Sequence, residues 1–143
     1  MTCCDTSFLY SLYGSDAHSS AAASFLRGID SPVSISEFNR FELTNALRLA
    51  FFRKLISAQQ RESFLEQFGN DVRKQLLSVE STNLADVLNE AGRISEAHTS
   101  SGGHRGFDIL HVAAARNLGA TDFLTFDQNQ RKLARAVGLK VPL

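Results

Sequence analysis

Residues 1–13, MTCCDTSFLYSLY, contain the change of hydrophobic period that decides the fold. Met1 to Asp5 is a short apolar run that ends in an acid, and this pattern predicts a strand. Thr6 to Tyr13 carries its apolar side chains at helical spacing, which predicts a helix directly after that strand. We therefore expect Asp5 to lie where the first strand meets the first helix.

Strands and helices alternate along the rest of the chain. The predicted strands cover residues 32–36, 76–79, 122–127 and 139–141. The predicted helices cover residues 15–28, 39–54, 58–75, 84–97, 107–117 and 128–137. This alternation predicts an α/β fold, a three-layer α/β/α sandwich around a central, mainly parallel sheet of four to five strands.

Two local patterns predict where helices begin and end. Asn39-Arg40-Phe41-Glu42 has the spacing of a capping box with asparagine as the cap, so a helix is expected to begin there. The segment from His98 to Gly106 is rich in serine and glycine, and we interpret it as a surface loop.

Length and composition fit one globular domain over residues 1–143. The chain is 43% hydrophobic and has fifteen basic and fifteen acidic residues, so its total charge demands neither nucleic acid nor a membrane as partner. From Ala97 onward, however, six arginine or lysine residues outnumber three aspartates, and this mildly basic distribution suits a polyanionic partner. Cys3 and Cys4 are interpreted as buried thiols, and no apolar run approaches the ~20 residues of a membrane span, so we expect a cytoplasmic protein.

Four acids share a position at or just before the predicted start of a helix: Asp5, Glu42, Asp108 and Asp127. Helix capping alone explains any one of them. In a parallel sheet, however, the strand ends that lead into helices lie along one edge, so the four acids are expected to converge. Their mutual repulsion would then favour a hard divalent cation, Mg²⁺ or Mn²⁺, held by carboxylate oxygens.

A cation held by carboxylates favours phosphodiester hydrolysis, because it can polarise a phosphate and make a bound water a better nucleophile. Thr6, Ser7 and Thr125 lie one or two residues from an acid and are interpreted as supporting polar groups. Taken singly, each of these hydroxyls fits a helix cap or a sheet edge equally well.

At these residues the chain resembles the PIN-domain family, and within it the VapC-like ribonucleases of bacterial and archaeal toxin–antitoxin pairs. The resemblance spans nearly the whole chain. It rests on Cys4-Asp5-Thr6-Ser7, the segments 41–47 and 107–115, Thr125-Phe126-Asp127, and the closing Gly138-Leu139-Lys140-Val141.

The resemblance implies an endoribonuclease that depends on magnesium or manganese, with Asp5, Glu42, Asp108 and Asp127 as catalytic and metal-binding residues. It further implies a homodimer, and an antitoxin that inserts into the active-site groove. His104 and Arg105 are candidates for contact with an RNA phosphate, although a solvated loop explains them as well. His111 lies one helical turn after Asp108, where a packed structural histidine and a functional one are both possible.

Three alternatives remain at this point. The first is a non-catalytic PIN-like module that binds RNA or protein. The second is a receiver-type signalling domain with bound magnesium, although the chain lacks the adjacent pair of acids that such a domain needs after its first strand. The third is a metal-free ribonuclease that uses two of His98, His104 and His111 together with the RNA 2′-hydroxyl.

Overall fold

The computed structural model describes residues 1–143 and has a four-stranded parallel sheet at its centre. The strands are β1 (Thr2–Cys4), β2 (Val33–Ser36), β3 (Leu77–Glu80) and β4 (Asp122–Leu124), in the spatial order β3-β2-β1-β4. Thr2 pairs with Val33 on one side and with Asp122 on the other. The predicted parallel sheet of four to five strands is therefore confirmed.

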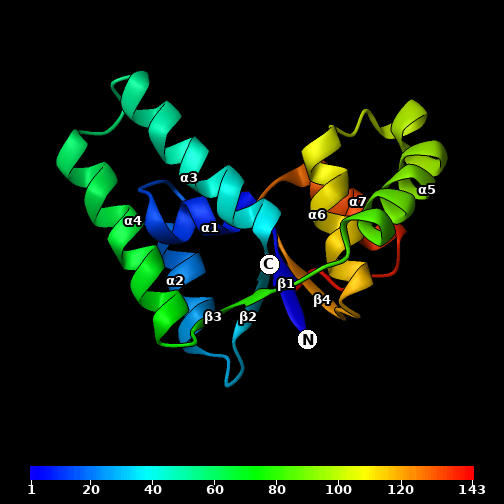
Figure 1. Ribbon diagram of the computed structural model, residues 1–143, viewed down its shortest axis with the longest axis horizontal. Helices are drawn as coiled ribbons and strands as arrows, with labels where there is room; N and C mark the ends of the chain where they lie inside the picture. Colours follow the sequence, from blue (N-terminus) through cyan, green and yellow to red (C-terminus); the bar gives the residue numbers. More distant parts are fainter.

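Seven helices connect and cover the strands. They are α1 (Thr6–Tyr13), α2 (Ser19–Arg27), α3 (Glu37–Phe52), α4 (Ala58–Arg73), α5 (Leu84–Gly102), α6 (Gly106–Asn117) and α7 (Gln128–Ala136). Figure 1 shows α1 to α4 on one side of the sheet and α5 to α7 on the other, so the three-layer sandwich is also confirmed.

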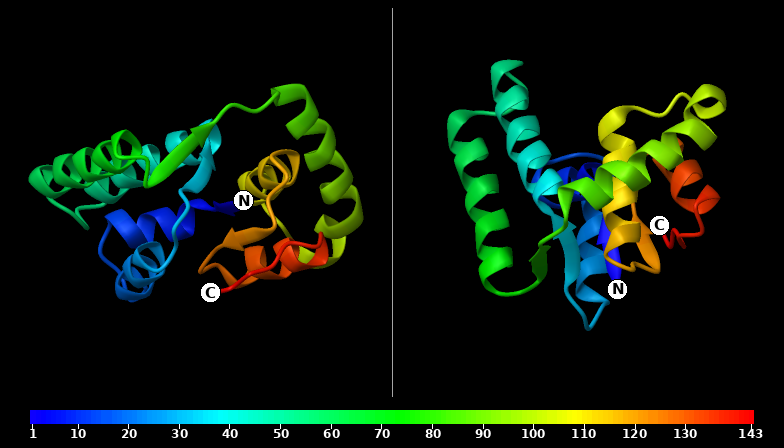
Figure 2. Two further views of the ribbon diagram at one scale, coloured as in Figure 1. Left: turned by 90° about the horizontal axis from the view of Figure 1, so that it is seen from below. Right: turned by 45° about the vertical axis from the view of Figure 1, so that its right-hand side comes forward.

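Each face of the sheet has its own hydrophobic core. The core on the α1–α4 side contains Cys4 and Phe8, whereas the core on the α5–α7 side contains Cys3 and Phe123. Cys3 and Cys4 thus point to opposite faces, as successive strand residues must, and both are buried free thiols. The two views of Figure 2 show the long α3–α4 hairpin on one flank and the α5–α7 layer on the other.

The start of α3 differs from its prediction. Ser36, at the end of β2, is the cap, and Asn39 lies three residues into the capping box, where its Oδ1 accepts the Ser36 backbone N–H at 2.9 Å. Asn39 also donates to the Cys4 carbonyl at 2.9 Å, so it joins α3 to the end of β1. Glu42 consequently lies in the second turn of α3, not in its first turn.

The predicted loop over residues 98–106 is too long, because only residues 103–105 lie between α5 and α6. Helix α5 continues to Gly102, and Gly103 ends it in the left-handed conformation with φ 65°, where its N–H bonds to the Thr99 carbonyl. Serine and glycine composition therefore predicted the wrong boundary, because the helix continues through weak helix formers until Gly103 provides the left-handed stop.

Two further elements differ from their predicted boundaries. The residues 139–141 contribute only a single bridge, between Asp122 and Lys140, rather than a fifth strand. Helix α2 begins at Ser19, because the Asp16 side chain accepts the His18 backbone N–H at 2.8 Å and holds a turn before the helix. No helix has the length and apolar character required to cross a bilayer.

Candidate functional site

Asp5 occupies the most enclosed position of the site. It follows β1 and caps α1, where its Oδ1 accepts the Phe8 N–H at 2.9 Å. Its carboxylate also accepts the Ser7 hydroxyl at 2.7 Å and the Thr125 hydroxyl at 2.6 Å, and only 1% of the residue is exposed. Burial raises the pKa of Asp5 to about 6, and the bonds from Thr125, Phe8 and Ser7 act in the opposite direction.

The hydroxyls around Asp5 connect two turns that are far apart in sequence. Ser7 Oγ accepts the Phe126 N–H at 2.9 Å, and Thr125 Oγ1 accepts the Asp127 N–H at 3.0 Å. The two hydroxyls are 3.2 Å apart. Ser7 and Thr125 therefore fix the start of α1 against the turn between β4 and α7. The strands β1 and β4 are parallel neighbours, and the helices that follow them, α1 and α7, cover opposite faces of the sheet.

Glu42 reaches the same region from α3 and meets His111 of α6. His111 Nε2 lies 2.6 Å from Glu42 Oε2 and 3.1 Å from Thr6 Oγ1. Since a carboxylate only accepts, Nε2 carries a proton in this contact. The burial of Glu42 by itself would raise its pKa, but the hydrogen bond and charge of His111, with Thr6 and Arg105, outweigh it and lower the pKa of Glu42.

Asp108 and Asp127 complete the acidic set. Asp108 lies in the first turn of α6, and its Oδ2 accepts Arg105 Nε at 3.0 Å. Asp127 caps α7 and accepts the Gln130 N–H at 2.8 Å. The buried Gln130 side chain also donates to the Asp108 carbonyl at 3.0 Å, so it holds α6 and α7 together beneath the two acids.

The four acids converge on one small cavity of about 80 Å³. Its lining contains no hydrophobic residue and consists of Asp5, Thr6, Ser7, Glu42, Arg105, Asp108, His111, Asp127 and Gln130. No three histidine, cysteine or carboxylate side chains stand close enough together to hold an ion as they lie. His111 and Arg105 hold two of the carboxylates instead.

The remaining candidate residues differ in whether they line the cavity. Arg105 lines the cavity with 77% of its side chain exposed, whereas His104 is buried and does not line it. The cavity contains His111 but neither His98 nor His104, so it lacks the histidine pair of a metal-free ribonuclease. Gln130 was missed by the sequence reasoning, because a buried glutamine within a helix has no local signal that separates it from a solvated one.

Comparison with known proteins identifies the family. The PIN domain family model matches residues 2–136, so the chain belongs to the PIN-domain family, and the receiver-type alternative is not supported. No curated protein matches the chain by sequence.

Solved structures share the fold over nearly the full chain. Mycobacterium tuberculosis VapC20, described as a sarcin-ricin loop cleaving toxin, is 17% identical with a TM-score of 0.72, and the match covers 99% of this chain and 98% of that one. FitAcB from Neisseria gonorrhoeae is 14% identical with a TM-score of 0.63, covering 99% and 96%. PAE2754 from Pyrobaculum aerophilum is 15% identical with a TM-score of 0.60, covering 98% and 87%.

Proposed function

Because the chain belongs to the PIN-domain family, we propose that it is a metal-dependent endoribonuclease that hydrolyses RNA phosphodiester bonds in the cytoplasm. One observation carries the proposal: carboxylates from four separate elements line a single cavity of about 80 Å³ without any hydrophobic neighbour. Helix capping alone does not explain this arrangement, since Glu42 lies in the second turn of α3 and caps nothing.

The donor set fits a hard divalent cation. Asp5, Glu42, Asp108 and Asp127 offer carboxylate oxygens, which Mg²⁺ and Mn²⁺ prefer, and the raised pKa of Asp5 reflects a buried carboxylate that lacks a cationic partner. When bound, such a cation polarises a phosphate oxygen and makes a coordinated water a better nucleophile. Glu42 and Asp108 each contact His111 or Arg105 through one carboxylate oxygen, so the second oxygen of each is available to an ion.

Neighbouring residues of the chain orient these carboxylates and offer a contact for phosphate. Ser7 and Thr125 hold Asp5 in one orientation through bonds of 2.7 Å and 2.6 Å. Arg105 has an exposed guanidinium that can bind a phosphate oxygen pair. His111 keeps Glu42 directed toward the cavity.

The biological role is proposed on the similarity to VapC20. We propose that the chain is the toxin of a toxin–antitoxin pair, that a cognate antitoxin protein inhibits it, and that it acts as a homodimer. The exposed apolar residues at the end of the α3–α4 hairpin, Phe52 and Leu55, support a protein partner, with 79% and 70% of their surfaces exposed.

The second candidate is a non-catalytic PIN-like module that binds RNA or protein. One observation favours it: the carboxylates are not assembled around an ion site as they lie, and two of them are already paired. Metal titration together with cleavage assays separates the two functions.

The test incubates purified protein with structured and unstructured RNAs in magnesium, manganese or EDTA. Wild type is compared with Asp5→Asn and Asp108→Asn. The matched control is Asp86→Asn, because Asp86 lies in the first turn of α5 as Asp108 does in α6, but away from the cavity. We expect metal-dependent cleavage that both site variants lose and the control retains. Unchanged cleavage in EDTA would contradict the mechanism.

A further inference from the structure

Two exposed phenylalanines precede two of the site's acids directly. Phe41 comes before Glu42 on α3, and Phe107 comes before Asp108 on α6. Their rings stack with centroids 6.2 Å apart and planes 27° apart, and the residues are 59% and 38% exposed. Helices from opposite sides of the sheet thus present one continuous aromatic surface.

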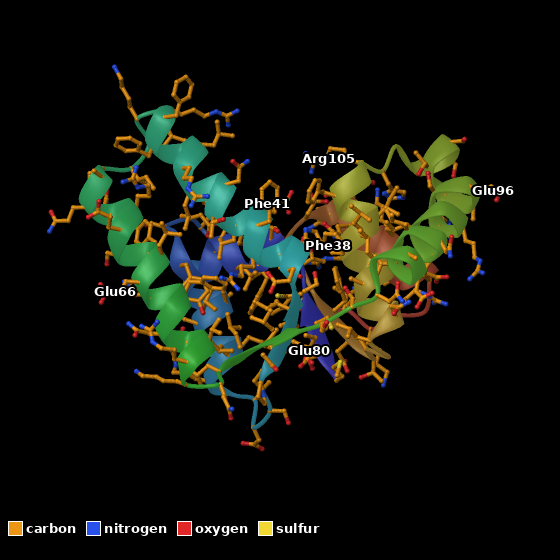
Figure 3. All side chains as sticks on the ribbon, viewed as in Figure 1. Phe38, Phe41, Glu66, Glu80, Glu96 and Arg105 are labelled. Atoms are coloured by element: carbon orange, nitrogen blue, oxygen red, sulfur yellow. The ribbon has the colours of Figure 1, made fainter.

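Core packing does not account for these rings. Neither belongs to the two hydrophobic cores, whereas Phe38, one turn earlier on α3, packs against the core of the α5–α7 side. Figure 3 shows Phe41, on α3, and Arg105, just before α6, near each other in the upper middle of the view. The two rings therefore leave adjoining apolar surface exposed to a partner.

The aromatic pair lies next to the acidic cavity. The Phe107 ring lies 6.2 Å from the His111 ring, and His111 lines the cavity and bonds to Glu42. Arg105, which precedes the same helix, also lines the cavity and exposes 77% of its side chain. An apolar flat surface, a guanidinium cation and the acidic cavity therefore adjoin one another.

This combination matches the parts of one nucleotide. A base has an apolar face that stacks on phenylalanine, and a phosphate pairs with arginine or with a metal ion. Resting on the proposed function, we propose that Phe41 and Phe107 form a stacking platform for one unpaired base beside the phosphate that is cleaved. A base within a duplex cannot reach the platform, so the substrate is a loop or a single strand.

Binding measurements test the platform. The variants Phe41→Leu and Phe107→Leu keep an apolar side chain but remove the aromatic ring. The separate variant Phe41→Trp keeps an aromatic ring at position 41. Phe52→Leu is the matched control, because Phe52 is also an exposed phenylalanine of α3 and lies at the other end of that helix. Each is made in the Asp5→Asn background, so that a labelled stem-loop RNA is bound and not cut. Thermal unfolding confirms that each variant folds.

We expect each leucine variant to weaken binding of the loop RNA by about 10- to 100-fold, as loss of one base stack does. Phe41→Trp and Phe52→Leu should bind as the parent does. The parent should also lose affinity when one loop base is replaced by an abasic residue, and the leucine variants should show no further loss from that replacement. This non-additivity identifies the base that stacks.

Three outcomes overturn the platform. They are equal RNA affinity of parent and leucine variants, additive effects of the leucine and abasic changes, and cleavage of a fully paired duplex as fast as of the loop. If the leucine variants instead lose only binding to a protein partner, the rings belong to a protein interface. If wild type cleaves no RNA in manganese, the proposed function itself is contradicted. That cleavage assay is independent of the binding measurements that test the platform.

Discussion

The two sides of the acidic cavity hold their carboxylates in different ways. Asp5 is buried and receives three neutral donors, from Ser7, Phe8 and Thr125, none of which a cation would need to remove. Glu42 and Asp108 are instead paired with His111 and Arg105, and Arg105 is largely exposed. The difference teaches that the Asp5 carboxylate is held on both oxygens by neutral donors, whereas Glu42 and Asp108 are each held through one oxygen by a basic side chain.

The largest expected effect is the loss of the rigid carboxylate. Asp5→Asn should lower metal-dependent cleavage by at least about a thousandfold, because losing a group that stabilises developing charge already lowers rates by 10²–10³. Glu42→Gln should be less severe, since Glu42 is 33% exposed and already shared with His111. Single-turnover cleavage of one RNA by both variants measures the ratio. Equal losses would abolish the proposed difference between the two sides.

The next effect is on stability without metal. Because the pKa of Asp5 is raised to about 6, its carboxyl binds a proton more tightly when folded, so folding is favoured at low pH. This contribution is complete below about pH 4 and is lost as the pH rises to about 6, and it corresponds to roughly 3 kcal/mol. Chemical unfolding in EDTA at pH 4.5 and 7.5 measures it.

The matched protein for that measurement is Asp5→Asn, which lacks the titrating group. Wild type should lose stability relative to the variant between the two pH values. A constant difference between them would mean that burial does not penalise the charged carboxylate. Addition of Mn²⁺ at pH 7.5 should restore wild type only.

A smaller effect is expected from the hydroxyls that orient Asp5. Thr125→Val removes the 2.6 Å donor and should weaken Mn²⁺ binding or cleavage by about 10- to 100-fold, as loss of other groups that orient metal ligands does. Thr125→Ser should retain both. Calorimetric titration with Mn²⁺ provides the measurement, and a serine variant as impaired as the valine variant would point to packing instead of hydrogen bonding.

The smallest effect concerns the exposed ion pair. Arg105→Gln should change the free energy of unfolding by less than about 1 kcal/mol, since the arginine side chain is 77% exposed and surface pairs contribute little. Its effect on RNA binding should be larger than its effect on stability. Denaturant melts and RNA affinity measured on the same sample compare the two, and a large loss of stability would show that Arg105 is structural.

Local signals in the sequence located the acids well. Asp5 and Asp127 follow apolar strands and cap helices, so their positions depend only on neighbours within a few residues. Glu42 was identified as the third residue after a predicted cap at Asn39, whereas the capping box in the structure joins Ser36 and Asn39. Both alternatives place a polar residue three positions after a cap. Glu42 lines the cavity with the other three acids, whereas its predicted place in the first turn of the helix was wrong.

Features that depend on packing were not accessible in the same way. On α5, Leu84, Val87 and Leu88 are all apolar and at helical spacing, yet Leu84 and Leu88 are 57% and 52% exposed while Val87 is fully buried. The contact of His111 with Glu42 joins residues 69 positions apart, so no local pattern indicates it. The stacked pair Phe41 and Phe107 was missed for the same reason, although each residue precedes an acid that the sequence had identified.

The placement of β1 has a consequence for the timing of synthesis. This strand is synthesised before its partner β4, and the Thr125 donor to Asp5 follows about 120 residues later. At 5–20 residues per second, roughly 6 to 24 seconds pass before the second half of the site exists. A nascent chain therefore carries Asp5 long before it carries the strand and the hydroxyl that hold this acid in the cavity, so the assembled cavity can form only after Thr125 has been synthesised.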